Sequence, residues 1–137
     1  MAHNGAVNKG SGLRVLVVDD NVDAVETLVM LLGLWGHDVR SAADGPAALQ
    51  AAAAHHPDVV LLDITLPGMT GYDVARQLRA APELRDAVLV AMTGHGEAAD
   101  KKAAREAGFT LHLLKPVEPD VLQKLLADLG ASRSGAG

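Results

Sequence analysis

Short apolar runs alternate with longer helix-prone segments five times along this chain. The apolar runs, which predict strands, lie at residues 13–18, 38–42, 58–62, 87–92 and 111–114. The segments that predict helices lie at residues 21–35, 46–56, 71–81, 97–107 and 119–129. Three of the runs are apolar at consecutive positions, which is typical of strands that helices cover on both faces. These three lie at 15–18, 59–62 and 88–92.

The ends of several predicted helices carry residues that favour helix boundaries. Gly36 follows the first helix and Gly108 follows the fourth, and a glycine in this place commonly ends a helix. The sequence "TGYD" at 70–73 has the Thr-x-x-Asp form of a helix start, and Pro119 stands where a first-turn proline is favoured. These signals support the same helix boundaries as the apolar pattern.

Strands and helices that alternate over short links predict parallel strands joined by right-handed helical crossovers. The expected fold is therefore α/β, a doubly wound five-stranded parallel sheet in a (βα)5 sandwich. The predicted domain covers residues 13–129. Residues 1–12 and 130–137, "MAHNGAVNKGSG" and "GASRSGAG", are rich in small and polar residues and predict flexible tails.

Composition narrows the class of protein. A chain of 137 residues is most simply one domain with a core of its own, and with three aromatic residues that core must be aliphatic. The net charge of −5 disfavours a nucleic-acid or anionic-membrane binder, either of which needs a basic face. The chain has no cysteine, no apolar run near the ~20 residues of a membrane span and no signal-peptide pattern. We therefore expect a cytoplasmic location, without nucleic-acid or membrane partners.

Polar residues follow four of the five predicted strands. Asp19 and Asp20 end the first strand, Asp63 the third, Thr93 the fourth and Lys115 the fifth. The carboxyl ends of parallel strands share one edge of the sheet, where ligands of open α/β sheets bind. We therefore expect a single cluster of three carboxylates, one hydroxyl and one ammonium group.

Such a cluster suits phosphoryl transfer. Three neighbouring carboxylates raise one another's pKa unless a cation compensates, and Mg²⁺ prefers oxygen ligands that include one or two carboxylates and a phosphate. Lys115 can pair with one phosphoryl oxygen, and Thr93 can donate a hydrogen bond to another. A carboxylate can act as the nucleophile, so one aspartate would attack while the paired aspartates hold the metal.

Each of these residues also has a purely structural interpretation. An aspartate after a strand commonly caps a helix or forms a turn, and a lone threonine or lysine at a strand end carries little information. Asn21 could cap the first helix and leave Asp20 merely solvated. The occurrence of all of them at four strand ends favours one functional site.

Four segments resemble the receiver domain of two-component response regulators, which has the CheY-like variant of the flavodoxin fold. They read "VLVVDDN", "DVVLLDITLPGMTGYDVARQLR", "VAMTGHGE" and "AGFTLHLLKPV". Their order and spacing match the family over nearly all of residues 13–129. The acidic pair, the Asp-x-x-Leu-Pro-Gly-Met-x-Gly motif, the Thr-Gly pair and the Lys-Pro pair together form a specific signature.

The resemblance implies a role for each matching residue. Asp63 would be the phosphoacceptor, which takes a phosphoryl group from the phosphohistidine of a histidine kinase or histidine phosphotransfer protein. Asp20 would bind Mg²⁺, or Mn²⁺, directly and Asp19 largely through water. Asp63 and the backbone carbonyl of Thr65 would complete the protein's share of the ligands.

The resemblance also implies how phosphorylation would be sensed. Thr93 would contact the phosphoryl group and shift on activation, and Lys115 would pair with it. The bond between Lys115 and Pro116 would be cis and would set the direction of the lysine. An output partner would bind the face formed by residues 97–107, 111–114 and 119–129.

The chain departs from the family pattern at the position that often carries a switching aromatic residue. His112 stands there, and it would either reorient as a switch or be a half-buried strand histidine. Thr65 and His95 occupy the positions that tune the lifetime of the phosphoryl group. Neither is an acid or a carboxamide that would orient an attacking water, so we expect slow self-hydrolysis.

The sequence-based conclusion is a phosphorylatable signalling switch and not an enzyme, apart from chemistry on its own Asp63. It would be a stand-alone regulator or a receiver excised from a larger protein such as a hybrid histidine kinase. One alternative is an aspartate-nucleophile phosphohydrolase, but Asp63-Ile64-Thr65 lacks the second carboxylate of that class and the chain has no room for a cap domain. Another is a pseudo-receiver that binds partners without phosphorylation, which the intact acidic pair, Asp63 and Lys115 argue against.

Overall fold

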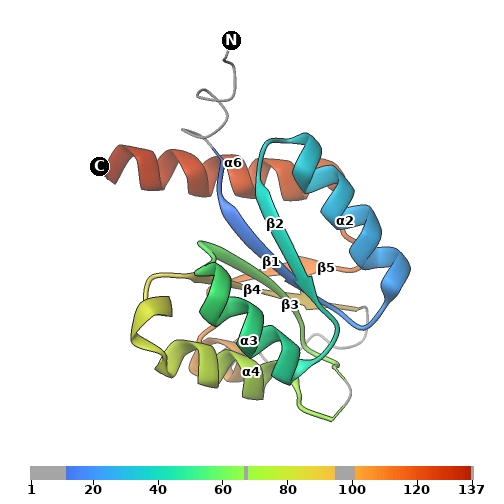
Figure 1. Cartoon of the computed structure of the whole chain (residues 1–137), viewed down its shortest axis with the longest axis vertical. Helices are drawn as coiled ribbons and strands as arrows, with labels where there is room; N and C mark the ends of the chain where they lie inside the picture. Colours follow the sequence, from blue (N-terminus) through green and yellow to red (C-terminus); the bar gives the residue numbers. More distant parts are fainter. Residues whose placement is uncertain (1–11, 67, 95–100, 137) are drawn as a thin grey trace.

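The described residues form five parallel strands and five α-helices in three layers (Figure 1). The computed structural model describes residues 12–66, 68–94 and 101–136. The sheet has the order β2-β1-β3-β4-β5. Its strands are β1 (Arg14–Val18), β2 (Asp38–Ala42), β3 (Val59–Asp63), β4 (Val88–Thr93) and β5 (Leu111–Leu114). The helices are α2 (Val22–Leu34), α3 (Gly45–His55), α4 (Gly71–Ala80), the 3-10 turn η1 (Pro82–Leu84), α5 (Lys101–Ala107) and α6 (Pro119–Ala136).

The predicted doubly wound α/β fold is confirmed, because helices cover both faces of the sheet. On one face, Leu28 and Leu32 of α2 and Leu122 and Leu126 of α6 pack against the strands. On the other face α3, α4 and α5 pack, and much of their contribution is alanine. β1, β3 and β4 are almost fully buried, as their unbroken apolar runs predict. None of the described helices is long and apolar enough to cross a membrane.

The predicted helix boundaries hold where polar side chains cap the helices. The Asn21 side chain accepts a hydrogen bond from the Ala24 amide and caps α2. Thr70 caps α4 in the same way, through the Asp73 amide at 3.2 Å. Gly108 has a φ of +114° directly after α5, a conformation that favours glycine. Pro119 is the first residue of α6.

Two helix boundaries differ from the prediction or cannot be compared with it. α6 continues to Ala136, seven residues beyond the predicted end at 129, because Gly130 lies within the helix instead of ending it with a positive φ. Residues 130–136 of the predicted C-terminal tail are therefore helical. The predicted start of the fourth helix at 97 and the N-terminal tail up to residue 11 lie outside the described residues.

His37 links the start of β2 to the start of β1. Its Nδ1 accepts a hydrogen bond from the Leu13 amide at 3.0 Å, and burial lowers the pKa of its ring from the ordinary value of 6.5. The ring is therefore neutral in the folded protein at pH 7, and the unfolded chain binds its proton more readily.

This difference predicts a pH-dependent stability. The free energy of unfolding should be highest above pH 6.5 and should fall as the pH drops through 6.5 towards the lowered pKa, because protonation then favours the unfolded chain. Urea unfolding between about pH 8 and about pH 5.5 would measure the slope. We expect a shallower slope for His37→Asn than for the wild-type protein; an unchanged slope in this variant would contradict the assignment to His37.

Candidate functional site

The strand register brings the predicted residues to one edge of the sheet. Val18 pairs with Leu62, so Asp19 and Asp63 are the next residues of neighbouring strands. Thr93 is the last residue of β4 and pairs with Leu114, which places Lys115 just beyond it. The polar residues that end these four strands therefore lie close together at the carboxyl edge of the sheet.

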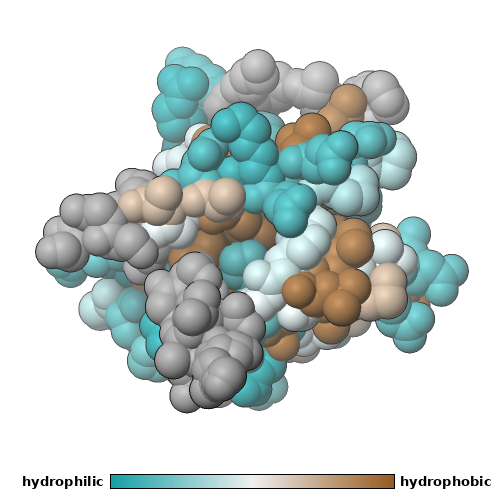
Figure 2. All heavy atoms as spheres, turned by 90° about the horizontal axis from the view of Figure 1, so that it is seen from above, coloured by the Kyte–Doolittle hydropathy of each residue, from teal (hydrophilic) through white to brown (hydrophobic). Residues whose placement is uncertain are grey.

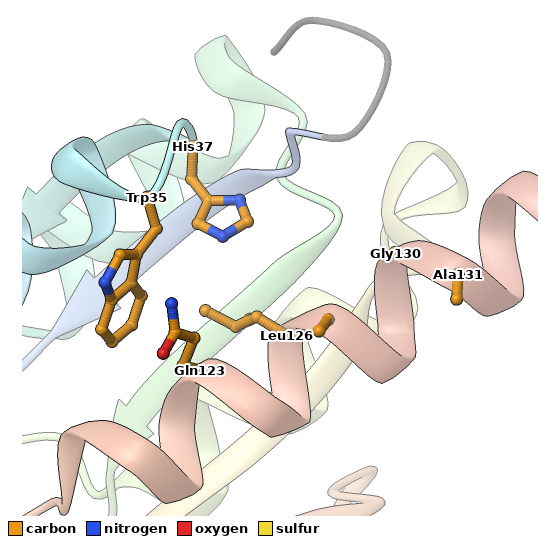
Figure 3. Close-up of a pocket in the computed structure, with 7 residues that line it drawn as sticks. Trp35, His37, Gln123, Leu126, Gly130 and Ala131 are labelled. Carbon is orange, nitrogen blue, oxygen red and sulfur yellow. The ribbon is translucent and has the colours of Figure 1, made fainter. Parts of the chain in front are cut away.

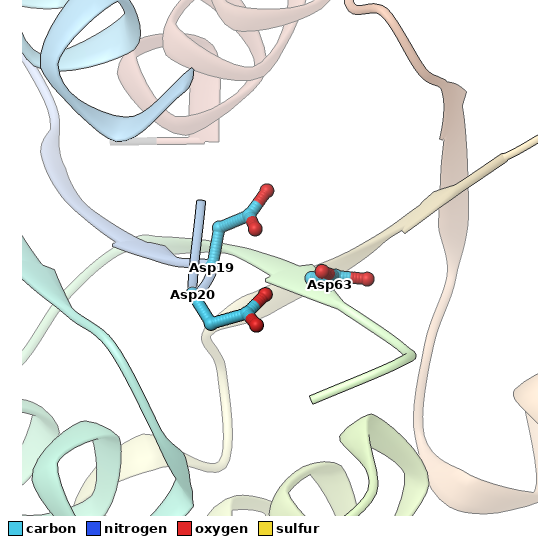
Figure 4. Close-up of side chains that lie close together, drawn as sticks. All are labelled: Asp19, Asp20 and Asp63. Carbon is cyan, nitrogen blue, oxygen red and sulfur yellow. The ribbon is translucent and has the colours of Figure 1, made fainter. Parts of the chain in front are cut away.

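The three carboxylates form a compact group. One oxygen each of Asp19, Asp20 and Asp63 lies within 4.8 Å of the others. Figure 4 shows Asp19 and Asp20 reaching from the end of β1 towards the side on which Asp63 ends β3. Asp19 and Asp63 are each only 2% exposed, whereas Asp20 faces solvent. The site is thus a buried carboxylate pair with a third carboxylate at its mouth.

Lys115 bridges the two buried carboxylates. Its Nζ lies 3.1 Å from Asp19 Oδ2 and 3.3 Å from Asp63 Oδ2. Burial lowers the pKa of this ammonium, but its contacts with both aspartates outweigh burial and leave the pKa raised. Lys115 is therefore a fixed positive charge between the two acidic groups.

The two buried aspartates differ in their acidity. Burial raises the pKa of Asp19, and the hydrogen bond from the Asn21 amide and the charge of Lys115 do not cancel that effect. Burial acts on Asp63 in the same sense, but the hydrogen bonds from Thr65 and the charge of Lys115 outweigh it and lower the pKa. Asp63 is thus ionised at neutral pH, as a carboxylate nucleophile must be.

Thr65 holds one oxygen of Asp63 in place. Its amide donates to Asp63 Oδ1 at 2.9 Å and its hydroxyl donates to the same oxygen at 2.8 Å. The other oxygen, Oδ2, faces Lys115. The orientation of the Asp63 carboxylate is therefore determined from both sides.

The remaining predicted residues lie near the cluster or outside the described region. Thr93 is half-buried, and its carbonyl accepts a hydrogen bond from the Lys115 amide at 2.7 Å. The peptide bond between Lys115 and Pro116 is cis, as the resemblance implies. His112 pairs with Ala91 in the sheet and is exposed, so the interpretation as a half-buried strand histidine is wrong. His95 lies outside the described residues.

Two residues that sequence reasoning did not assign to the site support it. The Asn21 amide donates to Asp19 Oδ1 at 3.0 Å and orients that carboxylate, in addition to the capping role expected of the Asn21 side chain. Gly71 packs against the end of β3, where an added Cβ would lie 2.6 Å from the Asp63 carbonyl oxygen. The glycine that follows the capping threonine in "TGYD" was the available signal for this close approach.

The donor set fits a hard divalent cation. Asp19 Oδ2 is buried and has an ionic contact with Lys115 but no hydrogen bond within the part of the chain that the structure describes. Among the described residues, one ammonium group faces two buried carboxylates with a third beside them, which leaves negative charge uncompensated within this part of the chain. Carboxylate oxygens in this arrangement are the ligands that Mg²⁺ prefers.

Comparison with known proteins agrees with the family resemblance seen in the sequence. The family model of the response regulator receiver domain matches residues 15–127. The response regulator PleD of Caulobacter vibrioides is 38% identical over 109 residues, which are 80% of this chain and 24% of PleD. The chain spans from about a quarter to about half of the length of the curated relatives it matches.

Solved structures share the fold. A putative response regulator from Chloroflexus aurantiacus has a TM-score of 0.80 at 33% identity, over 88% of this chain and 98% of that one. The receiver domain of the sensor histidine kinase PA1611 from Pseudomonas aeruginosa has a TM-score of 0.78 at 29% identity, over 88% of this chain and 98% of that one. The structure of that domain has a magnesium ion coordinated in its active-site cleft.

Proposed function

Because this chain belongs to the family of response regulator receiver domains, we propose that Asp63 is its phosphoacceptor and that residues 13–129 form the receiver unit. The donor would be a histidine kinase or a histidine phosphotransfer protein, in the cytoplasm. An oxygen of the Asp63 carboxylate attacks the phosphorus of the donor's phosphohistidine. The phosphorus–nitrogen bond breaks, the imidazole nitrogen keeps its electron pair, and an acyl phosphate forms on Asp63.

The environment of Asp63 is the observation that carries this proposal. Its carboxylate is buried, has a lowered pKa and is oriented by Thr65 on one oxygen and by Lys115 on the other. A nucleophile that is ionised, desolvated and held in one orientation begins the reaction close to its reactive geometry. Asp19 lacks this combination, because its pKa is raised.

The acidic group would hold Mg²⁺, or Mn²⁺ in its place. Asp20 would bind it directly, Asp19 largely through water, and Asp63 with the Thr65 carbonyl would supply the remaining protein ligands. The bound cation supplies positive charge against the carboxylates and the phosphoryl oxygens. Lys115, already within ion-pair distance of Asp63, would pair with a phosphoryl oxygen, and the Thr93 hydroxyl would donate to another.

The output of the switch would be read on the face made by α5, β5 and α6. Apolar side chains reach the protein surface, and Figure 2 shows brown areas among the teal ones on the face it presents. On β5 and α6, Leu114 and Val121 are 52% and 53% exposed. His112 is exposed on the same strand, where a change at Thr93 could reach it through the adjacent strand β4. A partner that covers these side chains would distinguish the phosphorylated state from the unphosphorylated one.

The direct test is phosphorylation by a small donor. We expect incubation with acetyl phosphate and Mg²⁺ to add one phosphoryl group to the intact protein, measured by mass spectrometry. The adduct should decay slowly, because neither Thr65 nor His95 is an acid or carboxamide that would orient a water. The absence of an adduct would favour a pseudo-receiver, whereas rapid turnover of many phosphomonoesters would favour a phosphohydrolase.

Removal of divalent metal should suppress the same reaction. With EDTA present we expect the rate of adduct formation to fall by about tenfold or more, because three carboxylates then repel the incoming phosphoryl group and, among the described residues, Lys115 alone opposes them. Added Mg²⁺ in excess should restore the rate. A rate that EDTA leaves unchanged would contradict a metal role for Asp19 and Asp20.

A further inference from the structure

A cavity of about 380 Å³ lies between the end of α2 and the middle of α6 (Figure 3). Trp35 follows α2 and His37 directly precedes β2, so the cavity lies at the amino end of the sheet. Asp63 lies at the carboxyl end of β3, and the cavity is therefore separate from the phosphoacceptor site. Its size is within the range of small-molecule sites in proteins.

The apolar lining of this cavity includes one flat aromatic surface. Trp35 is the single tryptophan of the chain and packs half-buried against the core beneath α2 and α6. Leu126 and Ala131 line the opposite side, and Gly130 between them on α6 adds no side chain. The small residues Gly130 and Ala131 leave this end of the cavity open, so a planar ring can enter there and meet the indole.

His37 provides a hydrogen-bond donor of known tautomer. Its Nδ1 accepts the hydrogen bond from the Leu13 amide, so the neutral ring carries its proton on Nε2. Burial lowers the pKa of this ring, which keeps it neutral at pH 7. Figure 3 shows the lower edge of the imidazole pointing towards Leu126 and the cavity, with the Gln123 amide lying between Trp35 and Leu126. The site therefore combines a donor at His37 with a group at Gln123 that can donate or accept.

The lining also restricts the charge of a ligand. Each side chain that lines the cavity, among the residues the structure describes, is uncharged. A phosphate or carboxylate that contacts this lining gives up part of its hydration without a cationic partner among these residues. Nucleotides and other anions are therefore poor occupants, and an uncharged ring system is favoured.

We propose that this cavity binds an uncharged planar nitrogen heterocycle, which stacks on Trp35 and accepts a hydrogen bond from His37 Nε2. The proposal concerns a second site and does not depend on phosphorylation of Asp63.

The test uses purine as the probe and the full ¹⁵N-labelled chain. The indole N–H resonance of Trp35 is unique in this protein, and we expect purine to shift it saturably together with the amides of Gly130 and Ala131.

Three variants test which side chains bind purine. Trp35→Leu keeps an apolar side chain but removes the flat surface, and it should weaken purine binding by about tenfold or more, measured from the amide shifts of Gly130 and Ala131. His37→Asn, which can still accept from Leu13 but cannot reach the cavity, should weaken it by about fivefold. Met30→Ala, an exposed position on α2 outside the cavity, should leave the affinity unchanged.

Two further probes distinguish the contribution of the planar ring to binding from that of the hydrogen-bond acceptor. Indole has a planar ring without an acceptor nitrogen and caprolactam has an acceptor without a planar ring, so both should bind several-fold more weakly than purine. The proposal is overturned if purine leaves the lining residues unshifted, if caprolactam binds as well as purine, or if Trp35→Leu retains full affinity for purine. Inorganic phosphate that shifts the same resonances would equally contradict an uncharged ligand.

Discussion

Asp63→Asn is expected to abolish the phosphoryl adduct that acetyl phosphate and Mg²⁺ produce on the wild-type protein. An amide is a far weaker nucleophile than a carboxylate and does not carry the charge that pairs with Lys115. The substitution preserves shape, and its oxygen can still accept the hydrogen bonds from Thr65. Intact-mass measurement should show the adduct reduced by on the order of a hundredfold or more.

Asp44→Asn is the matched control for this substitution. Asp44 is exposed and caps α3 through the Ala47 amide at 2.9 Å, and asparagine is about as good a cap. The control should therefore fold normally and gain one phosphoryl group at the wild-type rate. An adduct that survives in Asp63→Asn would contradict Asp63 as the phosphoacceptor, and its loss in both variants would show that the effect is not specific to this site.

Gly71→Ala is expected to cause a large loss of stability. A Cβ on Gly71 would lie 2.5 Å from the Ile64 Cα and 2.6 Å from the Asp63 carbonyl oxygen, both backbone atoms that cannot move aside alone. The start of α4 must then move away from the end of β3. We expect the free energy of unfolding, measured with urea, to fall by about 2–4 kcal/mol. The rate of phosphorylation should fall as well, because the backbone that must move belongs to Asp63, the proposed nucleophile.

Gly33→Ala is the same chemical change as Gly71→Ala, but it is expected to raise the free energy of unfolding instead of lowering it. Gly33 lies in α2, and a Cβ built on it would meet no atom within 4 Å. Alanine there should raise the free energy of unfolding by about 0.5–1 kcal/mol, because it restricts the unfolded chain and favours helix. Equal effects at positions 33 and 71 would rule out the close approach between α4 and β3 as the cause.

Much of the candidate site around Asp63 could be predicted because its parts are local features of the sequence. Each strand is a short apolar run, and each polar residue of the cluster stands directly after one of these runs. In a parallel sheet the ends of such strands meet at one edge, so the strand pattern alone places Asp63 near Asp19 and Lys115. The observed register and the 3.1 Å and 3.3 Å contacts of Lys115 follow that expectation.

The pKa shifts of the buried aspartates and the exposure of single side chains could not be predicted, because they depend on contacts between residues that are far apart in the sequence. Asp19 and Asp63 are the same residue type after similar strands, yet their pKa values move in opposite directions. Burial raises both pKa values, but Thr65 donates to Asp63 through its amide and its hydroxyl. Asp19 accepts one amide hydrogen bond from Asn21, and the charge of Asp63 raises its pKa further. Likewise, the exposure of His112 depends on which face of β5 it lies on, because the next residue, Leu113, is buried and Leu114 is exposed.

By itself, then, the sequence of this protein determined the order of its strands and helices, the doubly wound sheet and the identity of the residues that gather at its carboxyl edge. These follow from hydrophobic periodicity, helix capping and the geometry of parallel strands, which act over a few residues. Only the tertiary structure decided in which direction the pKa of each buried aspartate is shifted, how closely Gly71 approaches Asp63, and that Trp35 and Gln123, far apart in the chain, line one cavity. Those properties depend on burial, hydrogen-bond geometry and side-chain packing between distant segments, which exist only once the whole core has formed.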